Sequence, residues 1–327
     1  MQRSFNMQRG YPIALGAAAV LSTTAIFIRH LTQTYGVPAL VLALWRDAFV
    51  ALTLLPVLWL LRPALLRVER RHWRYLTLYG LLLSIFNALW TLSVALNGAA
   101  VATVLVYCSA AFTALLARWL LNERFDLGKL VAIAFCLAGC TLVSGALDAA
   151  AWQANPVGIL AGILAGLGYA IYSLLGRQAA QRGLSPWTTL LYTFAAATLF
   201  LLLFNLISGG PLPGSAAAPA ELLWLGDSLA GWGVLFVLAA GPTVLGFGLY
   251  NMSLVYLPSS VANLIVTLEP VFTAAVAYVL LGIQIAGSLM ILAGVLFLRI
   301  YEGWLAKQTN ETVVSSPLRS KLKEAAE

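Results

Sequence analysis

Long apolar runs separated by short polar segments make up the chain from Tyr11 almost to its end. Each run is about 20 residues long, the length at which an α-helix crosses the roughly 30 Å hydrocarbon core of a bilayer. The runs do not alternate apolar and polar positions as barrel strands do, so we predict helices, whose backbone groups bond to one another. The ten predicted helices cover residues 11–30, 37–61, 75–96, 99–121, 128–148, 157–177, 186–208, 231–256, 259–281 and 284–302.

The composition of the chain agrees with a membrane location. Apolar residues make up 61% of its 327 residues and charged residues only 9%, whereas about a quarter of the residues in a soluble domain are charged. The mean hydropathy is +0.90. The chain is therefore predicted to be an all-α integral membrane protein in a lipid bilayer. The first apolar run lacks a small-residue cleavage site, so we expect a retained helix rather than a signal peptide.

The positions of the basic residues predict the topology. With the N-terminus inside, only Arg29 and Arg46 of the 19 Lys and Arg residues fall outside cytoplasmic segments, as the positive-inside rule requires. Residues 1–10 and the polar tail 303–327 are then cytoplasmic, and the linker 149–156 is extracytoplasmic. We expect the tail to be disordered. The net charge of +7 does not indicate nucleic-acid binding, because the basic residues are scattered and lack a stacking platform.

Two tripeptides recur at nearly constant spacing. The tripeptide FTA at residues 112–114 returns 160 positions later at 272–274, and LAG at 137–139 returns 155 positions later at 292–294. The chain is therefore predicted to contain two related halves.

The predicted halves, residues 11–148 and 157–302, would each contain five helices. Since five is odd, the second half must enter the membrane from the opposite side, and such inverted repeats place the substrate site of many secondary transporters between the halves. The second half lacks a counterpart of residues 123–127, so its last two helices meet at residues 281–284. Antiparallel helices normally need a longer connection, so we interpret this junction as a missing loop or an engineered deletion.

Several classes of function lack the residues that they need. No HExxH, GxSxG or clustered histidines indicate a membrane enzyme, and no GxxxxGK[ST] loop indicates an ATP-driven pump. Cys108, Cys136 and Cys140 lie within apolar runs without metal-ligand spacing, and His30 and His72 are too few for a metal site. We therefore expect a protein without catalytic activity, cofactor or metal.

Four segments carry a resemblance to a known family. They read FTALLARWLLNERF from Phe112, GYAIYSLLGR from Gly168, LYNMSLVYLPSSVANLIVTLEPVFTA from Leu249 and LAGVLFL from Leu292. Over residues 11–299 the chain resembles the drug/metabolite transporter superfamily, specifically its EamA-type ten-helix members, and among these the YddG-like amino-acid exporters. The resemblance implies a carrier without ATPase, proton-coupled or not, that exports amino acids or other metabolites across the bacterial inner membrane.

Glu269 is the principal candidate for the transport site. It lies near the middle of the predicted helix 259–281, where a charge costs roughly 2.5–3.5 kcal/mol on insertion scales. The next residue, Pro270, removes a backbone donor and frees a carbonyl near Val266, so we expect a hinge there. Glu269 would bind substrate or protons, or alternatively form a structural polar contact that orients helices. The first half departs from this pattern, with Ser109 at the equivalent position.

Arg46 is the candidate charge partner of Glu269. An arginine fork could bind a substrate carboxylate, but a structural pair with Glu269 or with a helix C-terminus is the favoured interpretation. Its neighbour Asp47 is expected about 100° away around the helix, so the two side chains would not face one site.

Further polar and aromatic residues at similar depth are candidates for an aromatic-walled cavity that suits bulky apolar substrates. Helices 128–148 and 284–302 are rich in Leu, Ala and Gly, and would lie at the periphery of a monomer or weak homodimer. The alternative functions are a channel and an uptake permease for another small metabolite. The candidate binding residues beside Glu269 are Asn87, Trp90, Tyr107, Tyr169, Tyr250, Asn251 and Thr273.

Overall fold

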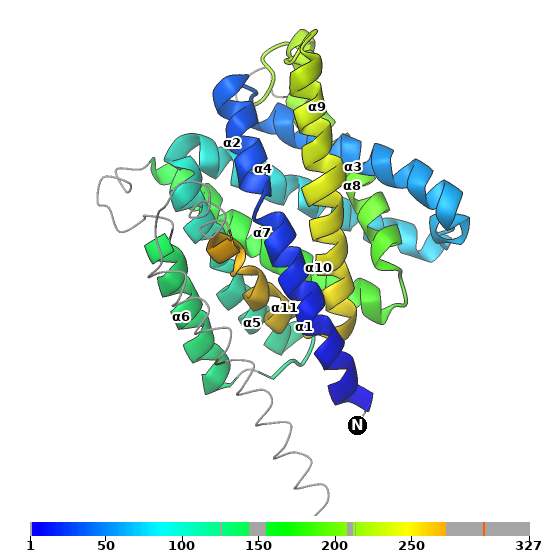
Figure 1. Cartoon of the computed structure of the whole chain (residues 1–327), viewed down its shortest axis with the longest axis vertical. Coiled ribbons are helices and arrows are strands. Elements are labelled where there is room, and N and C mark those ends of the chain that lie inside the picture. The colour runs from blue at the N-terminus through cyan, green and yellow to red at the C-terminus, as the bar shows by residue number, and fades with distance from the viewer. Residues whose placement is uncertain are drawn as a thin grey trace, which may run out of the picture.

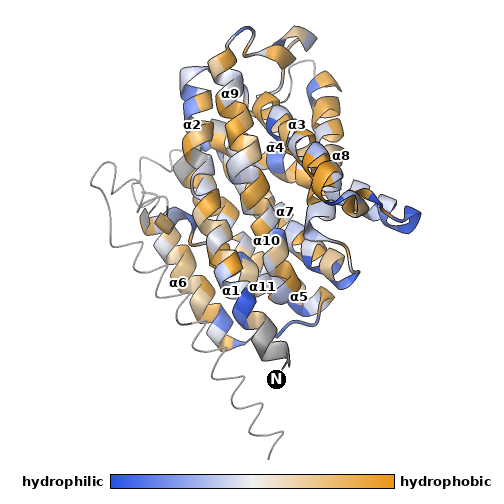
Figure 2. Ribbon diagram, turned by 45° about the vertical axis from the view of Figure 1, so that its right-hand side comes forward, coloured by the Kyte–Doolittle hydropathy of each residue, from blue (hydrophilic) through white to orange (hydrophobic). Residues whose placement is uncertain are grey.

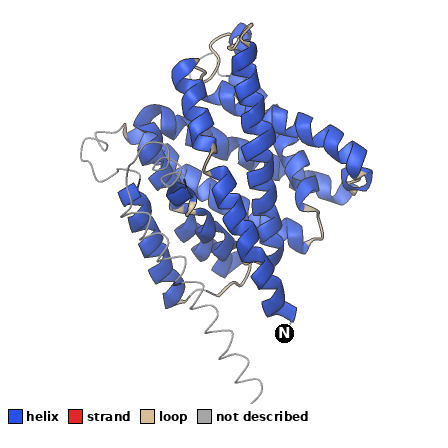
Figure 3. Cartoon of the chain, viewed as in Figure 1, coloured by secondary structure: helices blue, strands red, loops and turns tan. Residues whose placement is uncertain are grey.

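The computed structural model describes residues 2–124, 126–143, 155–207, 212, 214–272 and 297. These residues form a bundle of helices, and no strand occurs among them (Figure 1, Figure 3). The α-helices are α1 (Gln2–Leu21), α2 (Thr24–Thr34), α3 (Ala39–Leu61), α4 (Arg70–Tyr107), α5 (Ser109–Leu120), α6 (Leu127–Val143), α7 (Pro156–Gln181), α8 (Pro186–Ile207), α9 (Leu229–Leu238), α10 (Val244–Tyr256) and α11 (Ser259–Val266). Short 3₁₀ helices η1 (Pro63–Leu66) and η3 (Pro219–Leu223) and the π-helical turn η4 (Ala239–Thr243) complete the described elements.

Seven stretches of the described chain are long and apolar enough to cross a membrane, and two shorter apolar helices accompany them. All nine coincide with predicted helices, whereas the predicted tenth helix, 284–302, lies outside the described residues except Phe297. The junction at residues 281–284 also lies outside them. The seven long stretches are Met7–Thr34, Ala39–Leu61, Arg70–Val94, Val101–Leu120, Pro156–Gln181, Pro186–Ile207 and Leu229–Tyr256, and the shorter ones are Leu127–Leu142 and Ser259–Phe272.

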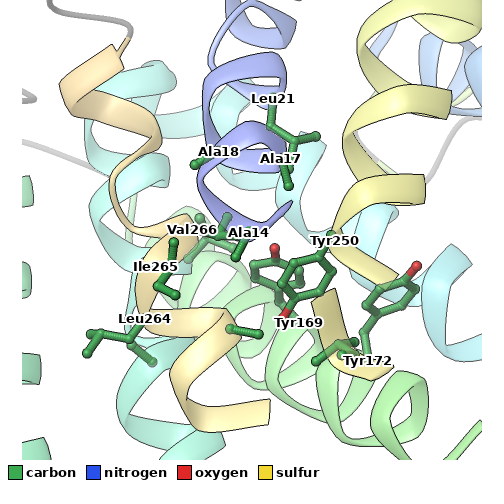
Figure 4. Packing of buried hydrophobic residues seen from close by; sticks show 14 of the residues in the cluster. Ala14, Ala17, Ala18, Leu21, Tyr169, Tyr172, Tyr250, Leu264, Ile265 and Val266 are labelled. Atoms are coloured by element: carbon green, nitrogen blue, oxygen red, sulfur yellow. The ribbon is translucent and has the colours of Figure 1, made fainter. Parts of the chain in front are cut away.

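The packing brings helices from the two predicted halves together. The long helix α4 packs most extensively against α7, and α1 packs against α10 and α11. Small side chains make these contacts close. Ala14, Ala17 and Ala18 of α1 are fully buried, with Ala14 and Ala18 on the side of α11 and Ala17 on the side of α10 (Figure 4). Hydrophobic residues cover most helix surfaces, while hydrophilic residues gather at helix ends and connections (Figure 2). An apolar outer surface is what a protein in contact with lipid tails requires.

Four predicted spans are interrupted, and of these only the break before Pro270 was expected from the sequence. The first span breaks between α1 and α2, where the hydroxyls of Ser22 and Thr23 donate to Ala19 O and Val20 O at 2.6 and 2.8 Å. The predicted helix 99–121 breaks at Cys108, the predicted helix 231–256 contains the turn η4, and α11 stops at Val266. Broken helices inside a membrane protein are tolerated where protein surrounds them.

Two pairs of backbone irregularities fall at equivalent positions of the two halves. Shifting the numbering by the 160 residues that separate the FTA tripeptides places Cys108 on Leu268, and both lie at a break in their span. The same shift places Gly98 on Pro258. Gly98 has a φ of 77° and separates two spans within α4, and Pro258 precedes α11. The left-handed backbone at Gly98 suits a residue without Cβ.

Hydrogen bonds from two tryptophan indole groups link the connection between α8 and α9 to other helices. The Nε1 atom of Trp45 donates to Leu222 O at 2.6 Å, and Nε1 of Trp224 donates to Tyr35 O at 2.9 Å. The 3₁₀ helix η3 lies within this connection.

We expect Gly80 to be essential for the contact between α4 and α8. A Cβ at this position would lie 2.5 Å from Ala196 Cβ and 2.8 Å from the backbone oxygen of Thr193, so Gly80→Ala should destabilise the protein by about 1–3 kcal/mol. The matched control is Gly233→Ala, because no heavy atom lies within 4 Å of that Cβ. Its expected effect is neutral or stabilising, by about 0.5–1 kcal/mol. Equal unfolding free energies for the two variants in detergent would contradict this account.

Candidate functional site

Glu269 lies directly after the break that ends α11 and contacts a tyrosine of the other half. The turn at Thr267 and Leu268 has bonds from Thr267 N to Leu264 O and from Leu268 N to Ile265 O, which tighten the backbone before Pro270. The Tyr107 hydroxyl forms a side-chain hydrogen bond with the Glu269 carboxyl. Tyr107 is the last residue of α4, so both groups of this contact lie beside a helix break.

Three tyrosines form a cluster next to this pair. Tyr169 and Tyr172 of α7 lie beside Tyr250 of α10, with ring centroids 5.7 Å apart for Tyr169 and Tyr250 and 6.5 Å apart for Tyr172 and Tyr250 (Figure 4). Tyr169 also stacks on Phe86 at 5.3 Å and interacts electrostatically with Glu269. All three tyrosines are buried, so in this conformation they pack against one another rather than line an open space.

Asn263 connects the tyrosine cluster to α5. Its Nδ2 donates to Ser173 Oγ at 3.0 Å, and its Oδ1 accepts from Ser109 Oγ at 3.1 Å. The Ser173 hydroxyl in turn lies 2.6 Å from the Tyr250 hydroxyl. Each of these side chains is buried, and buried polar groups that satisfy one another fix a single arrangement of the elements that carry them. The network therefore joins the two halves through the bond between Ser109 and Asn263.

A second polar group lies between α3 and α4. Arg46 Nε and Nη2 both donate to Asp47 Oδ1 at 3.3 Å, and Asn87 Nδ2 donates to Asp47 Oδ2 at 2.8 Å. Arg46 is 4% exposed and Asp47 is fully buried. The sequence argument kept these two neighbours apart, and that expectation was wrong. The long arginine side chain bends toward the adjacent carboxylate, which helix geometry at the Cα atoms alone does not exclude.

A crevice of about 290 Å³ opens between α2, α3 and α4. Among the described residues that line it, Trp90 is aromatic, and Thr32 and Thr91 are polar. Asn87 lies one turn before Thr91 on α4, and its backbone oxygen accepts from Thr91 Oγ1 at 2.8 Å. The crevice is lined by Ile28, Thr32, Val37, Pro38, Ala39, Leu42, Trp90, Thr91, Val94 and Gly214.

The structure brings some of the predicted site residues together and separates others. Tyr107 and Tyr169 interact with Glu269, and Tyr250 packs against Tyr169. Asn251 joins this cluster through its 3.2 Å bond from Nδ2 to the Tyr172 hydroxyl. Asn87 and Arg46 belong to the Asp47 group, and Trp90 belongs to the crevice. Thr273 lies outside the described residues.

Sequence reasoning missed the residues that connect the tyrosine cluster to α5. Asn263, Ser109 and Ser173 are small or single polar residues within apolar runs, and only their depth in the predicted spans could have marked them. Within the described residues, no group of three His, Cys, Asp or Glu side chains is placed to hold a metal ion.

The model of the EamA-like transporter family matches the chain twice, over residues 8–145 and 156–301. One match falls in each half of the chain, and together they span most of its length.

The curated relatives are transporters without a stated substrate. An "Uncharacterized transporter" of Archaeoglobus fulgidus is 27% identical over 299 residues, which cover 89% of this chain and 96% of the relative. The "Uncharacterized transporter YyaM" of Bacillus subtilis is 23% identical over 217 residues, which cover 64% of this chain and 68% of the relative. The fold is similar to that of a protein of known crystal structure, with a TM-score of 0.72 at 16% identity, and the match covers 92% of this chain and 99% of that protein's chain. These names give no support for a YddG-like specificity.

Proposed function

The chain belongs to the EamA-like transporter family, and from this premise we propose that it is a secondary transporter that exports neutral or aromatic amino acids by alternating access. The protein is a multi-pass membrane protein, as its family and its apolar helices indicate. The bacterial inner membrane, a monomer or weak homodimer, and cytoplasmic termini belong to this proposal.

The contact between Glu269 and Tyr107 is the observation that carries the proposal. A carboxyl in the middle of an apolar bundle is expensive, and this one lies where the two halves meet. Intramembrane ionisable residues in such positions mark substrate or ion pathways. The helix breaks at Cys108 and at Thr267 and Leu268 flank the contact, and transporter sites are typically built from such discontinuous helices.

In the proposed cycle the two halves rock about this contact. The tyrosines beside Glu269 are packed together in the conformation described above, and we infer that they separate when substrate enters. Their rings would then form apolar walls for a bulky side chain, and Glu269 would attract the substrate's ammonium group. Thr273, one turn beyond Glu269 in sequence, would add a hydroxyl to the same site, and Pro270 would act as the hinge.

The crevice suggests which end of the route is open. Its lining residues come mainly from α2, the beginning of α3 and α4, and α2 lies above α11 in Figure 1. In the predicted topology this is the extracytoplasmic end. We propose that Trp90 and Thr91 line the exit route and that Asn87 borders its floor. A channel or an uptake permease is the alternative function. A channel would not need the packed contacts of the tyrosine cluster and Asn263.

Uptake of a radiolabelled amino-acid panel into proteoliposomes tests this proposal. We expect saturable uptake of aromatic and neutral amino acids well above that of protein-free liposomes. A matched preparation with anionic and cationic amino acids tests selectivity. Uptake that rises linearly with concentration would favour a channel, and no uptake of any amino acid would exclude this substrate class.

A further inference from the structure

We infer that Glu123 is a latch that holds the two halves together at one end of the protein, and that the opposite end has no equivalent latch. The carrier would therefore rest closed at the Glu123 end and open at the other. This inference rests on the alternating access proposed above. It assigns a conformational role to a loop residue whose only role in the sequence analysis was as part of an unmatched segment.

Glu123 binds four donors of the other half. Its Oε1 accepts from Ser259 N and Ser259 Oγ, both at 2.7 Å, and its Oε2 accepts from Ser260 N at 3.2 Å and Ser260 Oγ at 2.6 Å. A carboxylate at the first turn of α11 also complements the partial positive charge of a helix N-terminus. Charge-assisted hydrogen bonds of this kind are stronger than neutral ones.

The surrounding residues hold this carboxylate in place. Asn122 has a φ of 52°, and Glu123 N donates to Ala117 O at 3.0 Å, so α5 ends in a left-handed cap that directs the chain toward α11. Lys129 is 4% exposed, and its Nζ donates to Ser260 Oγ at 3.1 Å and to Arg124 O at 2.6 Å. The Ser260 hydroxyl therefore bridges the ammonium group and the carboxylate.

The first half lacks the hydroxyl donors that an equivalent contact at the opposite end would need. A shift of 160 positions places Ser259 and Ser260 on Ala99 and Ala100, which lack hydroxyls. An inverted repeat would place that second contact at the opposite end of the protein. The two ends are thus chemically unequal.

The crevice lies at the end without the latch. Arg182, at the end of α7, is 4.3 Å from the ring centroid of Tyr75, near the start of α4. Arg177 donates to Leu254 O at 2.6 Å, close to the start of α11. The first turns of α4 therefore lie at the latched end. Trp90, in the crevice, is 15 residues further along α4 than Tyr75, which corresponds to about 22 Å of helix.

Thiol labelling of two reporters in lipid nanodiscs tests the latch without any substrate. Ser109→Cys, with Cys108 replaced by alanine, reports opening of the latched end, because Ser109 is fully buried against Asn263. Val94→Cys, in the same background, reports the crevice. In Glu123→Gln, an amide NH₂ replaces one acceptor oxygen. Maleimide should then label Ser109→Cys about tenfold faster or more, and Val94→Cys several-fold more slowly.

The matched control is Glu69→Gln, which removes a carboxylate from an exposed ion pair with Arg71 and should change neither rate. Unchanged rates in Glu123→Gln would overturn the latch, and so would faster labelling of Ser109→Cys alone, since local fraying does not close the crevice. If Glu123→Gln does not fold, Ser259→Ala/Ser260→Ala keeps both backbone donors and should shift both rates in the same directions by less. Unchanged rates in this folded variant would also overturn the latch.

The outcome is independent of the proposed substrate. If both labelling rates change as expected but no amino acid is transported, the proposed substrate class is contradicted and the latch is not. Saturable transport with unchanged labelling would contradict the latch and leave the proposed function intact.

Discussion

Replacing Glu269 with glutamine is expected to lower amino-acid transport by about tenfold or more while the protein stays folded. Glutamine keeps the size of the side chain and a carbonyl oxygen for the Tyr107 hydroxyl. It removes the negative charge that we propose attracts the substrate, and a hydrogen bond to a charged group is worth about 1.5–3 kcal/mol. Initial uptake rates in proteoliposomes, with and without an imposed pH gradient, measure this effect and reveal whether protons accompany the substrate.

Two variants make this result specific to the site. Asp227→Asn removes an exposed carboxylate in the connection before α9 and should leave uptake unchanged. Tyr107→Phe removes only the hydroxyl that contacts Glu269, and should lower uptake by several-fold. If Glu269→Gln transports as fast as the unmodified protein, Glu269 is a structural contact and the site must be sought elsewhere.

Breaking the Arg46–Asp47 pair is expected to have the largest effect on stability. Asp47→Asn leaves a guanidinium that is 4% exposed without its counter-charge, and loss of one partner of a buried pair costs about 3–5 kcal/mol. Replacing both residues, as Arg46→Met/Asp47→Leu, should recover most of this loss, because buried ion pairs are often no more stabilising than apolar residues. Recovery should be incomplete, since Asn87 Nδ2 loses its acceptor.

The free energy of unfolding in detergent, determined for the single and double variants, measures this coupling. The control is Glu69→Gln, whose exposed ion pair should contribute at most about 1 kcal/mol. A double variant that is less stable than Asp47→Asn would contradict the account. It would mean that the ion pair stabilises the protein more than the apolar residues that replace it. If the double variant is stable but inactive, the pair also takes part in transport.

The sequence predicted the apolar helices of the described residues well, because each predicted span contains about 20 apolar residues, a signal that one or two polar side chains cannot hide. It did not predict the breaks at Ser22 and Thr23 or at Cys108. Those depend on local bonds such as the one from Ser22 Oγ to Ala19 O and on neighbouring helices that surround the freed backbone groups. Hydropathy contains no information about either.

The candidate site could be predicted only in part. The depth of Glu269 followed from its place in an apolar run, but its partner depends on how the helices rotate against one another, which sequence spacing does not fix. The structure accordingly pairs Glu269 with Tyr107 and Arg46 with Asp47. Glu123 was overlooked for another reason: a charge in a short loop is normally solvated, and only the tertiary structure brings it to Ser259 and Ser260.

Counterflow in proteoliposomes tests alternating access most directly. The liposomes are preloaded with an unlabelled amino acid that the protein transports, and entry of the labelled form is followed at a concentration below saturation. A carrier that exposes one site alternately to the two sides predicts faster entry and a transient accumulation above equilibrium. Entry that is unaffected by preloading and proportional to the outside concentration would contradict the account, because a channel needs no return of an empty site.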